Sequence, residues 1–255
     1  MFRQLRILFL LLVLLLVTLT TWQTKVRTTD WDAPLWMAVY PINADGSLAS
    51  KDYIRQLKER DFDPIEQFLQ REAQRYGVPV DEPLIVKLAP ELENIPPTPP
   101  DNSNPLKVAW WSLKMRYWAM TNNNYDGPSP DIQMFILYHD PKQHERLAHS
   151  LGLEKGLIGV VNAYASKRMA GRNNVVIAHE MLHTVGASDK YELGSNLPIY
   201  PIGYAEPNRV PLFPQTTAEI MAGRISLSET EAIMPAGLQS VIVGEATALE
   251  INWRQ

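Results

Sequence analysis

One short segment restricts the structure of this chain more than any other, because it spaces histidines at the repeat of a helix. Residues 179–189 read His-Glu-Met-Leu-His-Thr-Val-Gly-Ala-Ser-Asp. Side chains four residues apart lie on one face of a helix, so His179 and His183 can present two imidazoles to the same metal ion. The segment therefore predicts a metal-binding helix that ends near Gly186 and is followed by a turn.

The neighbouring residues indicate a catalytic site. Glu180 lies one position round the helix, near enough to act on a water molecule at the metal without being a ligand. After Gly186 turns the chain out of the helix, Asp189 can return as a third, oxygen-donating ligand. Three protein ligands leave the fourth position of a zinc ion open, which is typical of catalytic rather than structural zinc. We therefore predict a zinc hydrolase with one catalytic Zn²⁺, most readily a protease.

An ordinary amphipathic helix is the alternative interpretation, since surface histidines also occur at this spacing. The context favours a metal site. The run from Val175 to Ala178 is apolar, Asn173 or Asn174 can cap the start of the helix, and Gly186 can end it. Asp189 has an alternative of its own, because aspartate is also common in turns after helices.

The pattern His-Glu-x-x-His-x-x-Gly-x-x-Asp over residues 179–189 resembles the metzincin clan of zinc endopeptidases, and within it the snapalysin-like branch whose third ligand is aspartate. The resemblance implies an α+β zincin fold, in which a mixed twisted sheet packs on the active-site helix and a smaller, irregular or helical C-terminal subdomain follows. It also implies a tight turn that carries a methionine beneath the zinc. Met221 is the first choice for this methionine and Met234 the second.

Many members of the clan carry a tyrosine two residues after that methionine, and neither candidate has one here. A tyrosine that stabilises the oxyanion must then come from elsewhere, and Tyr191 and Tyr204 are the candidates. The resemblance covers residues 173–191 well and 215–225 loosely, and the rest only by the order of elements. In the implied mechanism Glu180 is the general base, which takes a proton from water and passes it to the departing amine.

Composition excludes several other classes of protein. The 255 residues carry a formal net charge of −4 at pH 7 without a block of Lys or Arg, which argues against nucleic acid as a partner. The chain has no cysteine, so disulfides, thiolate metal ligands and cysteine nucleophiles are excluded. Metal ligation must therefore depend on histidine and carboxylate, and the expected partner is a peptide or protein substrate.

The start of the chain predicts a membrane anchor. Residues 1–6 are a short basic leader, and residues 7–19 are mostly apolar. Extended to Trp22, this stretch reaches the lower limit of about 17 residues for crossing a bilayer. No small-residue cleavage pattern follows, so an uncleaved signal anchor over residues 1–24 is favoured over a cleaved signal peptide. The catalytic domain is then expected outside the cytoplasm, in the periplasm or the extracellular space.

The remaining sequence predicts alternating strands and helices. We expect strands at residues 35–43, 83–88, 131–138 and 156–166, and helices at residues 50–60, 63–76, 106–120 and 247–253. The chain is expected to divide into an N-terminal subdomain, residues 25–186, and a C-terminal subdomain, residues 187–255, that contains the methionine turn. The resemblance places the strand at 156–166 on the upper edge of the cleft, where an extended peptide can add as a further strand.

Three further histidines, His139, His144 and His149, recur every five residues. This spacing does not share a helix face well, so they are expected to be surface residues rather than a second metal site.

Two other functions fit the same motif. One is a non-peptidase zinc hydrolase that acts on amide substrates of the cell envelope. The other is a catalytically silent, membrane-tethered scaffold stabilised by zinc. An intact Glu180 argues against the scaffold, because a purely structural site has no use for that carboxylate.

Overall fold

The centre of the molecule is a five-stranded mixed sheet. The computed structural model describes residues 27–100, 104–154 and 156–254, together with residues 4, 6, 7, 9–12 and 15. Within these residues the strand order is β2-β1-β3-β5-β4. Four strands are parallel and β4 is antiparallel to β5. The strands are β1 (Leu35–Asn43), β2 (Leu84–Leu88), β3 (Ile132–His139), β4 (Leu151–Leu153) and β5 (Ile158–Tyr164).

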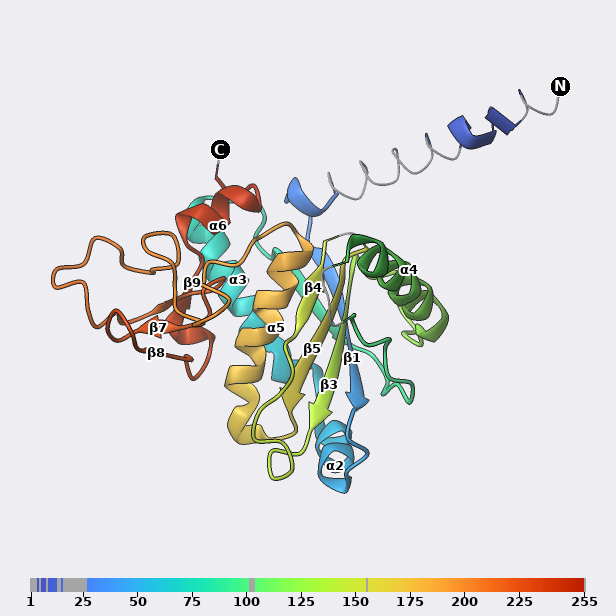
Figure 1. Ribbon diagram of the computed structural model, residues 1–255, viewed down its shortest axis with the longest axis horizontal. Helices are drawn as coiled ribbons and strands as arrows, with labels where there is room; N and C mark the ends of the chain where they lie inside the picture. Colours follow the sequence, from blue (N-terminus) through green and yellow to red (C-terminus); the bar gives the residue numbers. More distant parts are fainter. Residues whose placement is uncertain are drawn as a thin grey trace.

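Helices cover both faces of this sheet (Figure 1). The helices α3 (Asp63–Tyr76) and α5 (Ala170–Thr184) pack on one face, and α4 (Pro105–Asn122) packs on the other. Parallel strands that are buried on both faces have nearly continuous apolar sequences, and β1 is an example. Its residues Met37 and Val39 belong to the core beneath α3 and α5, whereas Tyr40 belongs to the core beneath α4.

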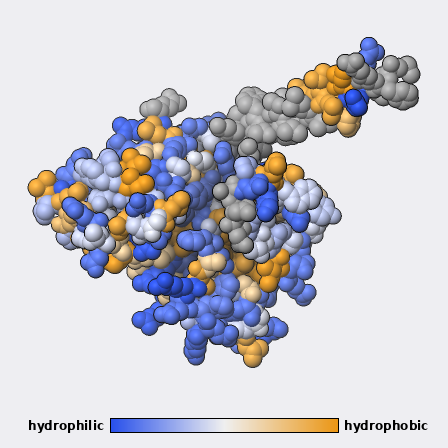
Figure 2. All heavy atoms as spheres, in the orientation of Figure 1, coloured by the Kyte–Doolittle hydropathy of each residue, from blue (hydrophilic) through white to orange (hydrophobic). Residues whose placement is uncertain are grey.

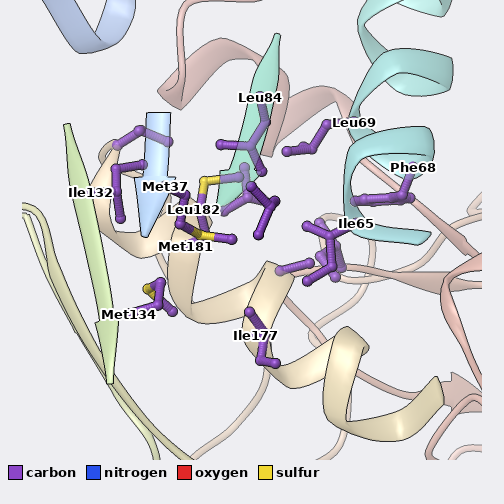
Figure 3. Close-up of a cluster of buried hydrophobic side chains, with 14 of the residues drawn as sticks. Met37, Ile65, Phe68, Leu69, Leu84, Ile132, Met134, Ile177, Met181 and Leu182 are labelled. Atoms are coloured by element: carbon purple, nitrogen blue, oxygen red, sulfur yellow. The ribbon is translucent and has the colours of Figure 1, made fainter. Parts of the chain in front are cut away.

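The larger core joins the sheet to the helix that carries the motif. Figure 3 shows Met181 and Leu182 of α5 directed toward sheet residues such as Met37, with Ile65 and Leu69 of α3 close by. All five side chains are fully buried. Burying each such side chain contributes about 1.5–3 kcal/mol, so the packing of α5 on the sheet holds the motif in place.

Shorter elements complete the chain. The second helix, α2 (Leu48–Gln56), follows β1, and α6 (Glu245–Glu250) closes the fold. Residues 185–217 form turns and isolated bridges. The remaining elements are the 3-10 helices η1 (Glu59–Phe62), η2 (Lys167–Met169) and η3 (Leu238–Ser240), and the short strands β6 (Ala218–Glu219), β7 (Ile225–Ser226), β8 (Ala232–Ile233) and β9 (Val241–Ile242).

The mixed sheet with several helices fits the predicted α+β class in general. The strands predicted at residues 35–43, 83–88 and 131–138 are confirmed as β1, β2 and β3. The predicted edge strand at 156–166 is corrected, because β5 lies inside the sheet between β3 and β4. The edge beside α5 is β4, whose sequence Leu-Gly-Leu is too short to show an alternating pattern.

Gly152 explains how β4 lies so close to α5. A Cβ atom at this position would meet the backbone carbonyl of Glu180 and would lie 2.6 Å from the Cβ of His183. Only glycine permits this approach, so the edge strand lies directly against the turn of α5 that carries the motif.

The structure contradicts the prediction of a membrane-spanning anchor. Among the described residues, no helix is long and apolar enough to cross a membrane. Apolar side chains described near the start of the chain, Phe9 among them, are exposed. Hydrophobic atoms of these residues are seen at the upper right of Figure 2. The rest of the predicted anchor, residues 16–24 included, lies outside the described residues, and the location predicted from the anchor is withdrawn with it.

Candidate metal centre

Two asparagines fix the helix that carries the motif. They were predicted as N-caps, but α5 begins at Ala170 and its N-cap is Met169, so that prediction is wrong. Asn173 instead pairs with both backbone groups of Tyr164, accepting from its N–H at 3.1 Å and donating to its carbonyl at 2.9 Å. Asn174 donates to the carbonyl of Asp61 at 2.9 Å. These bonds tie the start of α5 to the end of β5 and to η1.

Three predicted ligand atoms converge on one point. The Nε2 atoms of His179 and His183 lie 3.1 Å apart, and each lies close to the same carboxylate oxygen of Asp189. The distances to that Oδ1 are 3.2 Å from His179 and 3.1 Å from His183. Zinc bonds of roughly 2.0–2.2 Å at tetrahedral angles put ligand atoms about 3.3–3.6 Å apart. The three atoms are therefore spaced nearly as zinc ligands are.

The opposite ring nitrogens orient both imidazoles. His179 Nδ1 lies 2.9 Å from the carbonyl oxygen of Ile220, and His183 Nδ1 lies 2.8 Å from that of Ala187. A carbonyl can only accept, so each Nδ1 carries the proton, and a neutral ring then offers a bare lone pair at Nε2. Metal-binding histidines almost always have such a partner behind them, so the donor set fits a zinc ion.

Asp189 and His179 each shift the pKa of the other. Burial alone would raise the pKa of Asp189, but its hydrogen bonds with His179 and His183 outweigh burial and lower the pKa. Burial alone would lower the pKa of His179, but Asp189 and the charge of Glu180 outweigh it and raise the pKa. Each shift favours the charged form of its group, as expected where a carboxylate faces imidazoles.

Glu180 occupies the position expected of a general base. It is almost fully buried, and within the described part of the chain its Oε2 atom has no hydrogen-bond partner. Burial raises the pKa of Glu180, and the two histidines of the motif oppose the shift only in part. A cavity of about 540 Å³ opens here and is lined by both His179 and Glu180. A buried carboxylate atom without a partner, beside a cavity, is available to a ligand or a water molecule.

The turn at residues 219–223 lies directly behind His179. The N–H groups of Ala222 and Gly223 both donate to the carbonyl of Glu219, and Gly223 adopts the left-handed conformation with φ +67°. Met221 lies within this turn and is fully buried, and its carbonyl accepts from the N–H of Lys190 at 3.0 Å. The turn thus connects His179, through the carbonyl of Ile220, with the segment that carries Asp189. Met234, the second choice, lies in the wall of the cavity instead.

A buried carboxylate holds this turn to the end of the chain. Glu219 is fully buried, and its Oε1 atom accepts from Gly244 N–H at 3.1 Å and from Thr247 Oγ1 at 2.7 Å. The N–H of Ile220 donates to the carbonyl of Ile242. Residues after 240 therefore support the carbonyl that orients His179.

The two predicted tyrosines lie in different surroundings. Tyr191 lines the cavity, with its ring centroid 6.3 Å from that of His179. Burial raises the pKa of Tyr191, and the charges of Asp189 and Glu180 add to the shift. Tyr204 does not line the cavity and packs its ring against Tyr200 and Phe213. The geometry therefore favours Tyr191 for a role beside the site.

The cavity also contains charged residues that the sequence did not suggest. Arg172, Arg224 and His149 line it, together with Glu145 and other residues of the 147–150 segment. Arg224 is only half exposed, and its side chain has no hydrogen bond or ion pair within the described residues. Its position, three residues after Met221, could have been noticed from the sequence, but nothing local marks it as facing the site.

Comparisons with known proteins add no family to these observations. No protein-family model matches the chain, and no curated protein matches it significantly.

Proposed function

We propose that this protein is a zinc-dependent metalloendopeptidase of the metzincin type, with aspartate as the third ligand. The observation that carries the proposal is the meeting of three donor atoms within 3.2 Å of one another. One of the three residues, His179, lines a cavity together with Glu180, whose Oε2 atom has no hydrogen-bond partner among the described residues. A purely structural zinc site does not require a carboxylate at the position of Glu180. An ordinary surface helix does not require three donor atoms to lie this close together.

The ligands in this proposal are His179, His183 and Asp189, with the carbonyls of Ile220 and Ala187 behind the two rings. A zinc ion bound there supplies Lewis-acid chemistry, which polarises a scissile carbonyl and acidifies water. Glu180 takes the proton from the attacking water and delivers it to the departing amine, for which a raised pKa is an advantage.

Tyr191 has a supporting role in the same proposal. Its ring lines the cavity beside His179, so its hydroxyl can donate a hydrogen bond to the oxygen that becomes negative in the transition state. Burial and the nearby carboxylates raise its pKa, which keeps the hydroxyl protonated at neutral pH.

The edge of the sheet and the charges of the cavity suggest the kind of substrate. The edge strand β4 lies against α5, and an extended peptide can bind along such an edge by main-chain hydrogen bonds. Arg224, half-buried without an acidic partner, is suited to bind a carboxylate, because its guanidinium matches that group in shape and charge. We therefore expect a preference for peptides with an acidic side chain near the scissile bond.

The test is the Glu180→Gln variant, assayed for zinc content and for cleavage of a peptide library. We expect zinc to remain bound while turnover falls by about 10²–10⁴-fold, because the base is lost and the ligands are kept. Glu93→Gln is a matched control, since Glu93 is exposed and remote from the cavity lining.

Three results would count against the proposal. Full activity of Glu180→Gln would remove the base assignment. Zinc binding without cleavage of any peptide by the wild type would favour the scaffold, and cleavage of non-peptide amides alone would favour the other hydrolase.

A further inference from the structure

A second group of metal-binding side chains lies at the ends of the parallel strands, away from the motif. It consists of Asp45, after β1, His139, at the end of β3, and His144, in the loop that follows. One donor atom of each lies within 4.8 Å of the others, and His144 Nε2 lies 3.7 Å from Asp45 Oδ2. Parallel strands end at the same edge of a sheet, which explains why residues far apart in the sequence meet here.

The tautomer of His139 leaves one of its ring nitrogens without a hydrogen-bond partner among the described residues. Asn162 donates through its Nδ2 to the carbonyl of His149, so its Oδ1 atom is the one that faces His139 Nε2, at 3.0 Å. That oxygen can only accept, which places the ring proton of His139 on Nε2. The other nitrogen, Nδ1, then carries a bare lone pair, and it is buried with no hydrogen-bond partner among the residues that the structure describes.

Such a lone pair is costly to bury, and a cation beside it would satisfy it. Asp45 supplies the negative charge that a cation needs. Its backbone contacts hold it in place, since Oδ2 accepts from the N–H of Asp140 at 2.6 Å and Oδ1 from that of Ser47 at 3.0 Å. His144 is partly exposed, with 39% of its side chain accessible, and can adjust to complete the set.

We propose that Asp45, His139 and His144 form a second metal site, selective for zinc and similar first-row ions because two imidazoles and one carboxylate donate to it. The site is independent of the proposed peptidase activity. Its position gives it a structural role, because residues 145 and 147–150, which follow His144, form one wall of the cavity beside α5. An ion there would fasten the start of this loop to the ends of β1 and β3.

The experiment counts zinc in the full-length chain by mass spectrometry, after incubation with Zn²⁺ alone and removal of the free ion. We expect about two zinc ions per chain in the wild type, about one in His144→Ala, about one in His183→Ala and none in the double variant. His149→Ala is the matched control, because His149 is the one histidine of the five that belongs to neither set, and it should retain both ions.

A second measurement detects a zinc ion that binds too weakly to remain after the free ion is removed. In the His183→Ala background, Zn²⁺ should still raise the melting temperature, and His144→Ala added to that background should abolish the rise. A wild type with one zinc, lost in His183→Ala and kept in His144→Ala, would overturn this inference and leave the proposed function intact. The reverse pattern would support this site and overturn the proposed catalytic centre.

Discussion

Asp189 reaches the two imidazoles because the next residue holds its loop in place. Lys190 is buried, and its ammonium donates to the carbonyl of Ser188 at 2.8 Å and to Glu250 of α6 at 2.6 Å. The backbone of Lys190 is in turn bound to the turn of Met221. The proposed third ligand, on an irregular segment, is therefore held by contacts that no local pattern in the sequence reveals.

The first prediction concerns the charge of this ligand. Asp189→Asn keeps an oxygen in place but removes the negative charge, so we expect zinc affinity to fall by at least about tenfold. Competition with a chromophoric chelator measures the change. Asp126→Asn, in an exposed loop, is the control and should bind zinc as the wild type does. Unchanged affinity in Asp189→Asn would exclude Asp189 as a ligand.

The second prediction concerns pH. Burial alone would raise the pKa of Glu250, but hydrogen bonds from Lys190 and Ser188 outweigh it and lower the pKa. A carboxylate whose pKa is lowered on folding stabilises the folded state above its unfolded pKa, about 4.5, and loses that contribution as the pH falls.

The Glu250→Gln variant should therefore be less stable than the wild type at pH 7, by about 1–2 kcal/mol after allowance for partial exposure. The difference should shrink as the pH drops below about 4.5, in urea unfolding at a series of pH values. A difference that stays constant from pH 7 to pH 3 would show that the charge of Glu250 contributes nothing.

At the residue scale, the side chains of the motif could be identified from the sequence because they lie close together in it. Asp45 and Arg224 were not predicted, since each is placed by contacts between distant segments. The asparagine caps failed for a related reason. Asn173 and Asn174 have the right chemistry for a cap, but Tyr164 and Asp61 offer them partners in the folded chain, and the N-cap is Met169 instead.

Among the elements, β4 is tightly constrained, because it lies against α5 at Gly152. The third prediction is that Gly152→Ala destabilises the protein by about 1–3 kcal/mol, since the new methyl group meets the backbone of α5. Proposed peptidase activity should fall with it, because Glu180 and His183 adjoin the contact. Gly194→Ala is the control, as nothing lies within 4 Å of a Cβ there. Equal melting temperatures for the two variants would contradict the prediction.

Element prediction succeeded where apolar runs were long. The strands β1 and β3 are continuous apolar segments bounded by turn residues, and both were located within one residue at each end. The strand β4 has three residues and no pattern, and its pairing with β5 depends on the loop between them. Because β4 was not predicted, the strand at residues 156–166 was wrongly expected at the edge.

At the scale of the whole molecule, α3 connects the end of the chain to the rest. Glu72 is buried and pairs with Arg71 and Arg75, and its carboxylate also accepts from the N–H of Val243 at 3.0 Å. Tyr76 donates to the carbonyl of Val243 at 2.8 Å. This polar network therefore joins the two subdomains predicted on either side of residue 186. No pattern in the sequence reveals the network.

The fourth prediction tests this network. Glu72→Ala leaves two arginines and a backbone N–H without their partner, so we expect a loss of about 2–4 kcal/mol in the free energy of unfolding. Urea denaturation gives this value. Glu82→Ala, at an exposed position, should change stability by less than about 0.5 kcal/mol. A similar small change in Glu72→Ala would mean that the network adds no stability.

The support of His179 by the last part of the chain has a consequence for how the protein is made. The carbonyl of Ile220 is positioned through Ile242, Gly244 and Thr247, so the imidazole behind it is not held until those residues exist. Domains generally begin to fold from the N-terminus during synthesis. The sheet and the motif helix can therefore form on the ribosome while the site is still incomplete, and the proposed hydrolase is expected to stay inactive until residues 242–247 have been translated.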